Sequence, residues 1–396
     1  MGKQYNQQSV YAAAISRYEQ IFEEFGKNVY FSFSAGKDST VMIHLAIEVA
    51  KRMDCLPINV LLIDLEAQYK ATMSHAYDIM SLPEVNPYWI CLPLNLRNSV
   101  SMYQPQWLCW DPDNEDNWIR EIPDADGVIS DIDYFDFFEV GMEFEEFVVK
   151  FGEWFAEGKH AACGVGIRSD ESLNRYRTMK NEHKCTLDGK MWTTKVIDDL
   201  YNFYPIYDWR TEDVWSAIGK NNWSYNKIYD LMYQQGKSIH ECRICQPFGD
   251  DQKVGLDLFR SCEPETWATL VDRVSGANFG NIYCKSFLMG HMKILLPDGH
   301  SWRTYTEFLL ETIPEYEKEW YLEKFNKFMS WWAERGYPDG IPDSADPHLE
   351  SSKKAPSWRR LAKVILKNDK LCKSLSFAQT KNQFRKYRDM RDKYEK

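Results

Sequence analysis

Residues 28–39 read NVYFSFSAGKDS, and this stretch decides the fold. Its first half, Asn28 to Phe33, is rich in aromatic residues and includes a valine, which favours a β-strand. Thr40 to Arg52 follow with apolar residues at helical spacing. The intervening loop has small residues whose backbone N–H groups can turn onto an anion at the start of a helix; its members are Ser34, Ala35, Gly36, Lys37, Asp38 and Ser39. The stretch therefore predicts a strand, a phosphate-binding loop and a helix.

The side chains of this loop have separate expected roles. Lys37 can add positive charge, and Asp38 or Ser39 can cap the helix or support a metal ion. An alanine at position 35 fits the loop only if its φ angle is negative. The Walker A motif is excluded, because Asp38 follows the lysine and Phe31 stands where that motif has its first glycine. An ordinary strand-to-helix turn is the alternative interpretation.

The chain around the loop alternates between strand-like and helix-like segments. Strands are expected at residues 57–65, 88–94 and 164–167, and helices at residues 11–25, 69–80 and 144–156. Such alternation indicates an α/β fold, in which a parallel sheet is wound with helices.

The pattern changes after Pro205. Helices are expected at residues 211–218, 305–333 and 358–367. We therefore predict a nucleotide-binding domain at residues 1–235 with an acidic, aromatic insertion at about 105–147. A cysteine-containing module at residues 236–300 and a helical C-terminal region with a basic tail at residues 301–396 follow.

The loop and three other segments carry a family resemblance. SAGKDS resembles the SGGKDS loop of the PP-loop ATP pyrophosphatase superfamily, with alanine in place of the first glycine. The stretch LLIDLEAQYKAT at residues 61–72 occupies the place of that superfamily's second strand, which receives adenine and ribose. GIRSDES at residues 166–172 and YPIYDWRTEDVW at residues 204–215 look like segments of phosphoadenosine-phosphosulfate (PAPS) reductases.

The resemblance implies an adenine nucleotide alpha hydrolase-like fold that binds ATP or a PAPS-like adenine nucleotide together with Mg²⁺. The implied nucleotide-binding residues are Phe33, the loop residues Ser34 to Ser39, Asp64, Gly166 and Arg168. The implied catalytic residues are Lys37, Asp38, Arg168 and Arg175. Two alternatives stay open: the arginines can pair with Asp170 and Glu171, and Asp64 can cap the following helix.

Two later segments narrow the resemblance. HECRICQPFGDDQKVGL at residues 240–256 and APSWRRLAKVILKND at residues 355–369 resemble the DUF3440 subgroup of PAPS-reductase-like proteins, typified by YbdN and IbrA. Members of that subgroup are commonly paired with a ParB-like protein partner.

The reaction is constrained by a motif that this sequence lacks. PAPS reductases use a cysteine in a C-terminal E-C-G-x-H motif, and the chain has no such string. The loop motif and the resemblance together imply an enzyme that cleaves ATP between the α and β phosphates and activates or adenylates an acceptor, in a nucleic-acid-linked, defence or regulatory system. The alternatives are a PAPS reductase or sulfotransferase, and a non-catalytic nucleotide-sensing subunit that works with the ParB-like partner.

Cysteines form a candidate metal site. Cys242 and Cys245 make a C-x-x-C pair, and Cys262 and Cys284 complete four ligands for zinc or an iron–sulfur cluster. The irregular spacing of the second pair leaves free buried thiols or a redox pair as alternatives.

Charge is divided unevenly along the chain. The net charge is −11, yet residues 351–396 hold 15 lysines and arginines against 4 acidic residues. Aromatic residues are interleaved with these cations, so the tail is a candidate nucleic-acid surface; a solvated helical face is the alternative. Residues 111–146 hold 14 acidic residues and one arginine, Arg120.

The start of the chain and its apolar runs bear on localisation. The first ten residues are polar, and the apolar runs are too short to cross a bilayer. We therefore expect a cytoplasmic protein without a membrane partner.

Overall fold

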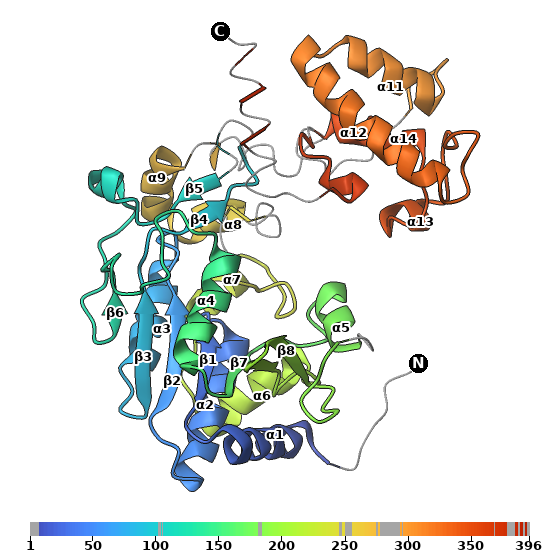
Figure 1. Cartoon of the computed structure of the whole chain (residues 1–396). Coiled ribbons are helices and arrows are strands. Elements are labelled where there is room, and N and C mark those ends of the chain that lie inside the picture. The colour runs from blue at the N-terminus through green and yellow to red at the C-terminus, as the bar shows by residue number, and fades with distance from the viewer. Residues whose placement is uncertain are drawn as a thin grey trace. The chain divides into compact units, whose positions relative to one another are not determined.

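The computed structural model describes residues 8–101, 104, 106–180, 184–244, 248–249, 256–274, 276–277, 294, 296–367, 369–377, 385–386, 389–390 and 393 (Figure 1). The chain forms two compact units. Residues 1–98 and 106–275 make the first, and residues 99–105 and 276–396 make the second. The division at residue 275 falls inside the range 236–300 of the expected cysteine-containing module, which stays a prediction.

The first unit is built on a seven-stranded sheet. In spatial order its strands are β6 (Val128–Ile129), β3 (Val85–Ile90), β2 (Ile58–Ile63), β1 (Val29–Phe33), β7 (Ala161–Val165), β9 (Leu200–Phe203) and β8 (Thr193–Ile197). All neighbours run parallel except β8, which is antiparallel to β9. The predicted α/β fold with a mainly parallel sheet is confirmed.

Adjacent residues of the central strand β1 show how helices cover both faces of this sheet. Tyr30 packs its ring against Phe151 of helix α4 (Phe144–Ala156), with centroids 5.3 Å apart. Phe31 packs against Tyr18 of helix α1 (Val10–Phe25) at 6.0 Å. Because successive side chains of a strand point to opposite faces, α4 and α1 lie on opposite sides of the sheet.

The remaining helices of the first unit connect or follow these strands along the chain. Helix α1 packs on α2, which packs in turn on α6. Their bounds are α2 (Lys37–Arg52), α3 (Lys70–Met80), α5 (Leu173–Lys180), α6 (Thr211–Asn221), α7 (Ile228–Gln234), α8 (Leu256–Cys262) and α9 (Pro264–Arg273). Helix α2 connects β1 to β2, so its first residue lies at the carboxyl end of β1, the edge where open α/β sheets bind ligands.

The acidic, aromatic insertion is folded. Strands β4 (Asn95–Arg97) and β5 (Gln106–Leu108) pair antiparallel, a 3₁₀ helix η1 spans Pro112–Asn117, and β6 joins the edge of the main sheet. Phe135 is buried and packs on Phe147 and Trp154, with ring centroids 5.8 Å and 4.9 Å apart. Its acidic residues thus surround an aromatic core that continues into α4.

The second unit is helical. It contains α11 (Trp302–Glu311), α12 (Glu315–Ala333), α13 (Pro347–Ser351), α14 (Trp358–Leu366) and the 3₁₀ helix η4 (Lys373–Leu375). The expectation of one helix over residues 305–333 is wrong, because Pro314 precedes α12 as its N-cap and separates it from α11. Tyr321, Phe325, Leu361 and Val364 are part of its core. None of the described helices is both long and apolar enough to span a membrane.

Candidate functional site

The predicted phosphate-binding loop, residues 34–39, leads into helix α2. Helix α2 begins at Lys37, and its N-cap is Gly36, which supplies no side-chain hydrogen bond. The Lys37 N–H donates to the hydroxyl of Tyr229 at 3.0 Å. Among the described residues, no acceptor receives the N–H groups of Gly36, Asp38 or Ser39. These amides and the helix dipole make an anion-binding terminus.

The loop is closed on itself by its two serines. The Ser34 N–H donates to Ser39 Oγ at 3.3 Å, and the two hydroxyl oxygens lie 3.1 Å apart. Ser39 Oγ also donates to the carbonyl of Gly36 at 3.1 Å. Phe33, at the end of β1, is buried beneath the loop. The turn is therefore tight and its shape is fixed by its own side chains.

Ala35 has a left-handed backbone conformation, which was not predicted from the sequence. Its φ is +53°, so the expectation of a negative φ is wrong. A left-handed alanine costs about 1–2 kcal/mol. The buried amide of Asn226 offsets this strain, because its Nδ2 donates to the Ala35 carbonyl at 3.0 Å and to Thr72 Oγ1 at 2.9 Å. Asn226 Oδ1 in turn accepts from the Ile228 N–H at 3.0 Å.

Lys37 is a buried cation held at the loop. Only 4% of the residue is exposed. Its Nζ lies 3.2 Å from Asp38 Oδ2 and donates to the Cys242 carbonyl at 3.3 Å. The ring of Tyr229 lies beside it, with the centroid 5.2 Å from Nζ. Because ordering the chain has already restrained this amine, it can meet an incoming anion with little further loss of entropy.

Arg168 brings a second positive charge to the same place. Its Nε lies 2.5 Å from Asp38 Oδ1, and its side chain is 2% exposed. Gly166, just before it, packs so closely that a Cβ there would lie 3.1 Å from the Ser39 N and Cα atoms. Two buried cations thus share one carboxylate, which leaves the loop with a net positive charge.

Asp64 forms an ion pair with a residue of the acidic insertion. It follows β2, is 2% exposed, and accepts from the indole N–H of Trp89 at 3.0 Å. The guanidinium of Arg120 forms an ion pair with its carboxylate. Neighbouring Glu66 is fully buried and pairs with Arg273 at 3.1 Å. The expected contact of Asp64 with a nucleotide stays a prediction.

Among the described residues, no hydrogen bond or ion pair joins Arg175 to Lys37, Asp38 or Arg168. Arg175 is partly exposed on α5, and its Nε lies 3.8 Å from Glu171 Oε2. This is the ion pair that the sequence left open as an alternative. Its expected catalytic role stays a prediction.

The candidate metal site is described only in part. Cys242 is buried, and Cys262 ends α8; burial raises the pKa of both thiols. Cys245 and Cys284 lie outside the described residues. Within the described part of the chain, no three histidine, cysteine or acidic side chains are grouped to hold a metal ion. The four-cysteine site stays a prediction.

Sequence reasoning missed the residues that support the loop from outside. Asn226 and Tyr229 lie some 190 residues beyond it in the sequence, around the start of α7. Their segment has no pattern that distinguishes it from an ordinary turn and helix. Arg120 offered a signal, because it is the one arginine in the acidic stretch. A cation alone among so many acids is a candidate for a specific buried pair.

The family is settled by comparison with known proteins. The PAPS reductase domain model matches residues 148–236, and the DUF3440 model matches residues 236–344 and 337–386. YbdN of Escherichia coli K12, an uncharacterized protein, is 41% identical over 364 residues, which are 89% of this chain and 87% of YbdN. This chain belongs to the YbdN-like, DUF3440 subgroup of the PAPS-reductase-like family. The predicted PP-loop fold class is thereby confirmed.

Three solved structures show some likeness to this chain. FMN adenylyltransferase of Candida glabrata, with FMN and an ATP analogue, is 16% identical over 57% of this chain and 64% of that one, with a TM-score of 0.34. PAPS reductase of Candida auris is 11% identical over 59% and 95%, with a TM-score of 0.27. The tRNA thiolase NcsA of Methanococcus maripaludis, with its [4Fe-4S] cluster, is 13% identical over 71% and 83%, with a TM-score of 0.32. TM-scores this low do not by themselves establish a shared fold.

Proposed function

We propose that this chain binds ATP at the α2 terminus and cleaves it between the α and β phosphates, transferring the adenylyl group to an acceptor. The observation that carries the proposal is the set of N–H groups at Gly36, Asp38 and Ser39, which have no acceptor among the described residues, beside buried Lys37. A helix terminus of this kind binds phosphate oxygens through backbone amides and the helix dipole. The lysine adds charge where a pyrophosphate leaving group would develop it.

In the proposed reaction, a nucleophilic atom of the acceptor attacks the α phosphorus. The bond from that phosphorus to the oxygen bridging to the β phosphate breaks, and its electron pair leaves with pyrophosphate. The adenylyl group stays on the acceptor, whose proton is released to solvent or a base. Lys37 and the loop amides stabilise the leaving pyrophosphate, while Arg168 stabilises charge on the phosphates from the other side of Asp38.

Asp38 is the carboxylate that would hold the implied magnesium ion, once the negative phosphates of ATP offset the positive charge of Lys37 and Arg168. Asp38 Oδ1 and Oδ2 each hold one cation, and each oxygen has a further lone pair to offer. Magnesium in nucleotide sites is usually held by one or two carboxylates together with phosphate oxygens and water. Asp38 would be the carboxylate, and the ion would supply charge neutralisation between the phosphates.

The test is the product pattern from ATP labelled in the α phosphate, incubated with the purified chain and Mg²⁺. The proposal expects labelled AMP or an AMP adduct together with pyrophosphate, and a loss of both in Lys37→Ala. Lys51→Ala, in the last turn of the same helix and exposed, is the matched control and should retain activity. Formation of ADP and orthophosphate would contradict the proposed bond cleavage.

If the chain binds ATP without cleaving it, a role as a nucleotide-sensing subunit replaces the enzymatic one. The ParB-like protein that the family resemblance predicts is then the first component to add. PAPS serves as the competing ligand in the same assay: if thiol-dependent sulfite is formed from PAPS, the reaction is reductive and the adenylyl-transfer proposal is wrong.

A further inference from the structure

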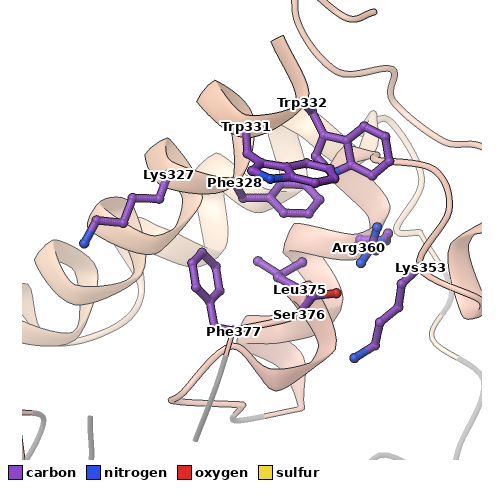
Figure 2. A pocket seen from close by; sticks show the side chains of 9 residues that line it. All are labelled: Lys327, Phe328, Trp331, Trp332, Lys353, Arg360, Leu375, Ser376 and Phe377. Carbon is purple, nitrogen blue, oxygen red and sulfur yellow. The ribbon is translucent and has the colours of Figure 1, made fainter. Parts of the chain in front are cut away.

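A cavity of about 370 Å³ lies in the second unit (Figure 2). Its lining comes from α12, from the turn after α13, from α14 and from the residues at and after η4. The volume is within the range of sites that hold small organic groups. All of the lining residues belong to the second unit.

Aromatic rings make much of the cavity wall. Phe328, Trp331 and Trp332 of α12 lie close together in Figure 2, and Phe377 lies across from them. Trp331 is 49% exposed, yet it is held in place by two partners. Trp332 packs edge-on against it at 4.8 Å, and the guanidinium of Arg335 lies 3.9 Å from its ring centroid. A fixed, exposed indole is a platform for stacking a planar ring.

The polar part of the wall is positively charged. Lys327, Lys353 and Arg360 line the cavity, and none of the lining residues in the described part of the chain is acidic. Lys327 pairs with Glu323, but Lys353 donates to the Lys373 carbonyl at 2.9 Å. Arg360 donates to the carbonyls of Ala355 and Ser374.

Among the described residues, neither Lys353 nor Arg360 forms an ion pair with a carboxylate. The charge of Glu350 acts on Arg360, but that carboxylate is paired with Arg359 and Lys363, so this part of the second unit keeps a positive surplus. Arg360 is only 6% exposed, so its charge is poorly screened by water. The ring of Phe328 lies 5.1 Å from its guanidinium carbon, which places the cation against the aromatic wall. Unpaired cations beside stacking rings select a ligand that is both planar and anionic.

We propose that this cavity binds an unpaired nucleotide of single-stranded nucleic acid, with the base stacked on Trp331 and its phosphate near Lys353 and Arg360. A nucleotide unit carries both features, an aromatic base that can stack on an indole and a negatively charged phosphate. The composition of the C-terminal sequence favours a polymer over a free nucleotide, since residues 351–396 hold 15 lysines and arginines against 4 acidic residues. Such a surplus attracts a chain of phosphates.

The experiment measures binding of a fluorescein-labelled 15-nucleotide oligo(dT) to the full chain by anisotropy, at low and at physiological salt. Trp331→Ala should weaken binding about 5- to 150-fold, the range for losing one stacked base. Lys353→Ala should weaken binding and reduce the slope of affinity against salt by about one. Both side chains are exposed, and retained melting temperatures confirm that the variants fold.

Two matched variants separate the cavity from the general charge of the tail. Phe308→Ala removes an exposed ring of α11, and Lys367→Ala removes an exposed lysine after α14; neither lines the cavity. Phe308→Ala should bind oligo(dT) as the wild type does, and Lys367→Ala should lose clearly less affinity than Lys353→Ala. The proposal is overturned by absence of binding, by equal binding of a duplex of the same length, or by equal losses in Lys353→Ala and Lys367→Ala.

Discussion

Replacing Asn226 with alanine removes a buried side chain that joins the phosphate-binding loop to α3 and α7. Three hydrogen bonds are lost: those to the Ala35 carbonyl, to Thr72 Oγ1 and from the Ile228 N–H. Asn226 itself is fully buried, so water does not simply replace these contacts. The strained φ of Ala35 then loses the contact that holds it.

The magnitude follows from these contacts. Each buried polar group that loses its partner costs about 1–3 kcal/mol, and partial relaxation reduces the sum for neighbouring groups. We therefore expect Asn226→Ala to destabilise the first unit by about 2–4 kcal/mol, an equilibrium change of roughly 30- to 900-fold. Asn221→Ala is the control, because Asn221 is exposed and, among the described residues, its side chain hydrogen-bonds to the Ala217 carbonyl of its own helix.

The assay is hydrogen–deuterium exchange of peptides from β1 and α2, which reports the opening of the first unit without interference from the second. Exchange in Asn226→Ala should accelerate by the factor above, while Asn221→Ala stays within about 0.5 kcal/mol of the wild type. Affinity for ATP should fall as well, since the loop amides are no longer prearranged. Unchanged exchange in β1 and α2 would refute the assignment of Asn226 as the clamp of the loop.

Three further predictions concern the same unit. Burial lowers the pKa of His44 and His75 to about 4, below the ordinary 6.5. The free energy of unfolding should therefore be highest above pH 6.5 and fall toward pH 4, by up to about 3 kcal/mol for each histidine. Urea midpoints measured between pH 4 and pH 6.5 check this, and His44→Gln should make the midpoint depend less on pH. Arg120→Ala leaves Asp64 buried without its cation and should cost about 3 kcal/mol in urea unfolding; a neutral result would contradict the pairing. Gly166→Ala should lower the melting temperature or displace α2 and weaken ATP binding, because its Cβ would crowd backbone atoms; wild-type values for both would show that the gap is larger.

Much of the fold was predictable because its signals are local. The apolar run at residues 57–65 gave β2, and the periodicity at residues 144–156 gave α4 with its observed bounds. The helix after the loop was expected from Thr40 but begins at Lys37. Lys37, Asp38 and Ser39 carry polar side chains, so apolar periodicity could not locate the first turn.

The candidate site was predictable only for residues that lie in a local sequence motif. Lys37, Asp38 and Arg168 lie in motifs and do come together. Asn226 contacts Ala35 across 191 residues, and no local pattern reports such a distant hydrogen bond. The break between α11 and α12 was missed because aromatic residues at helical spacing continue on both sides of Pro314.

We propose that the loop before α2 binds the phosphates of an adenine nucleotide. Equilibrium titration of the full chain with ATP and Mg²⁺ tests it directly, comparing wild type, Lys37→Ala and Lys51→Ala. A charge-assisted contact to phosphate is worth about 1.5–3 kcal/mol, so the account predicts affinity about ten- to hundred-fold weaker in Lys37→Ala and unchanged in Lys51→Ala. Equal affinity in Lys37→Ala, or no binding by the wild type, would contradict it.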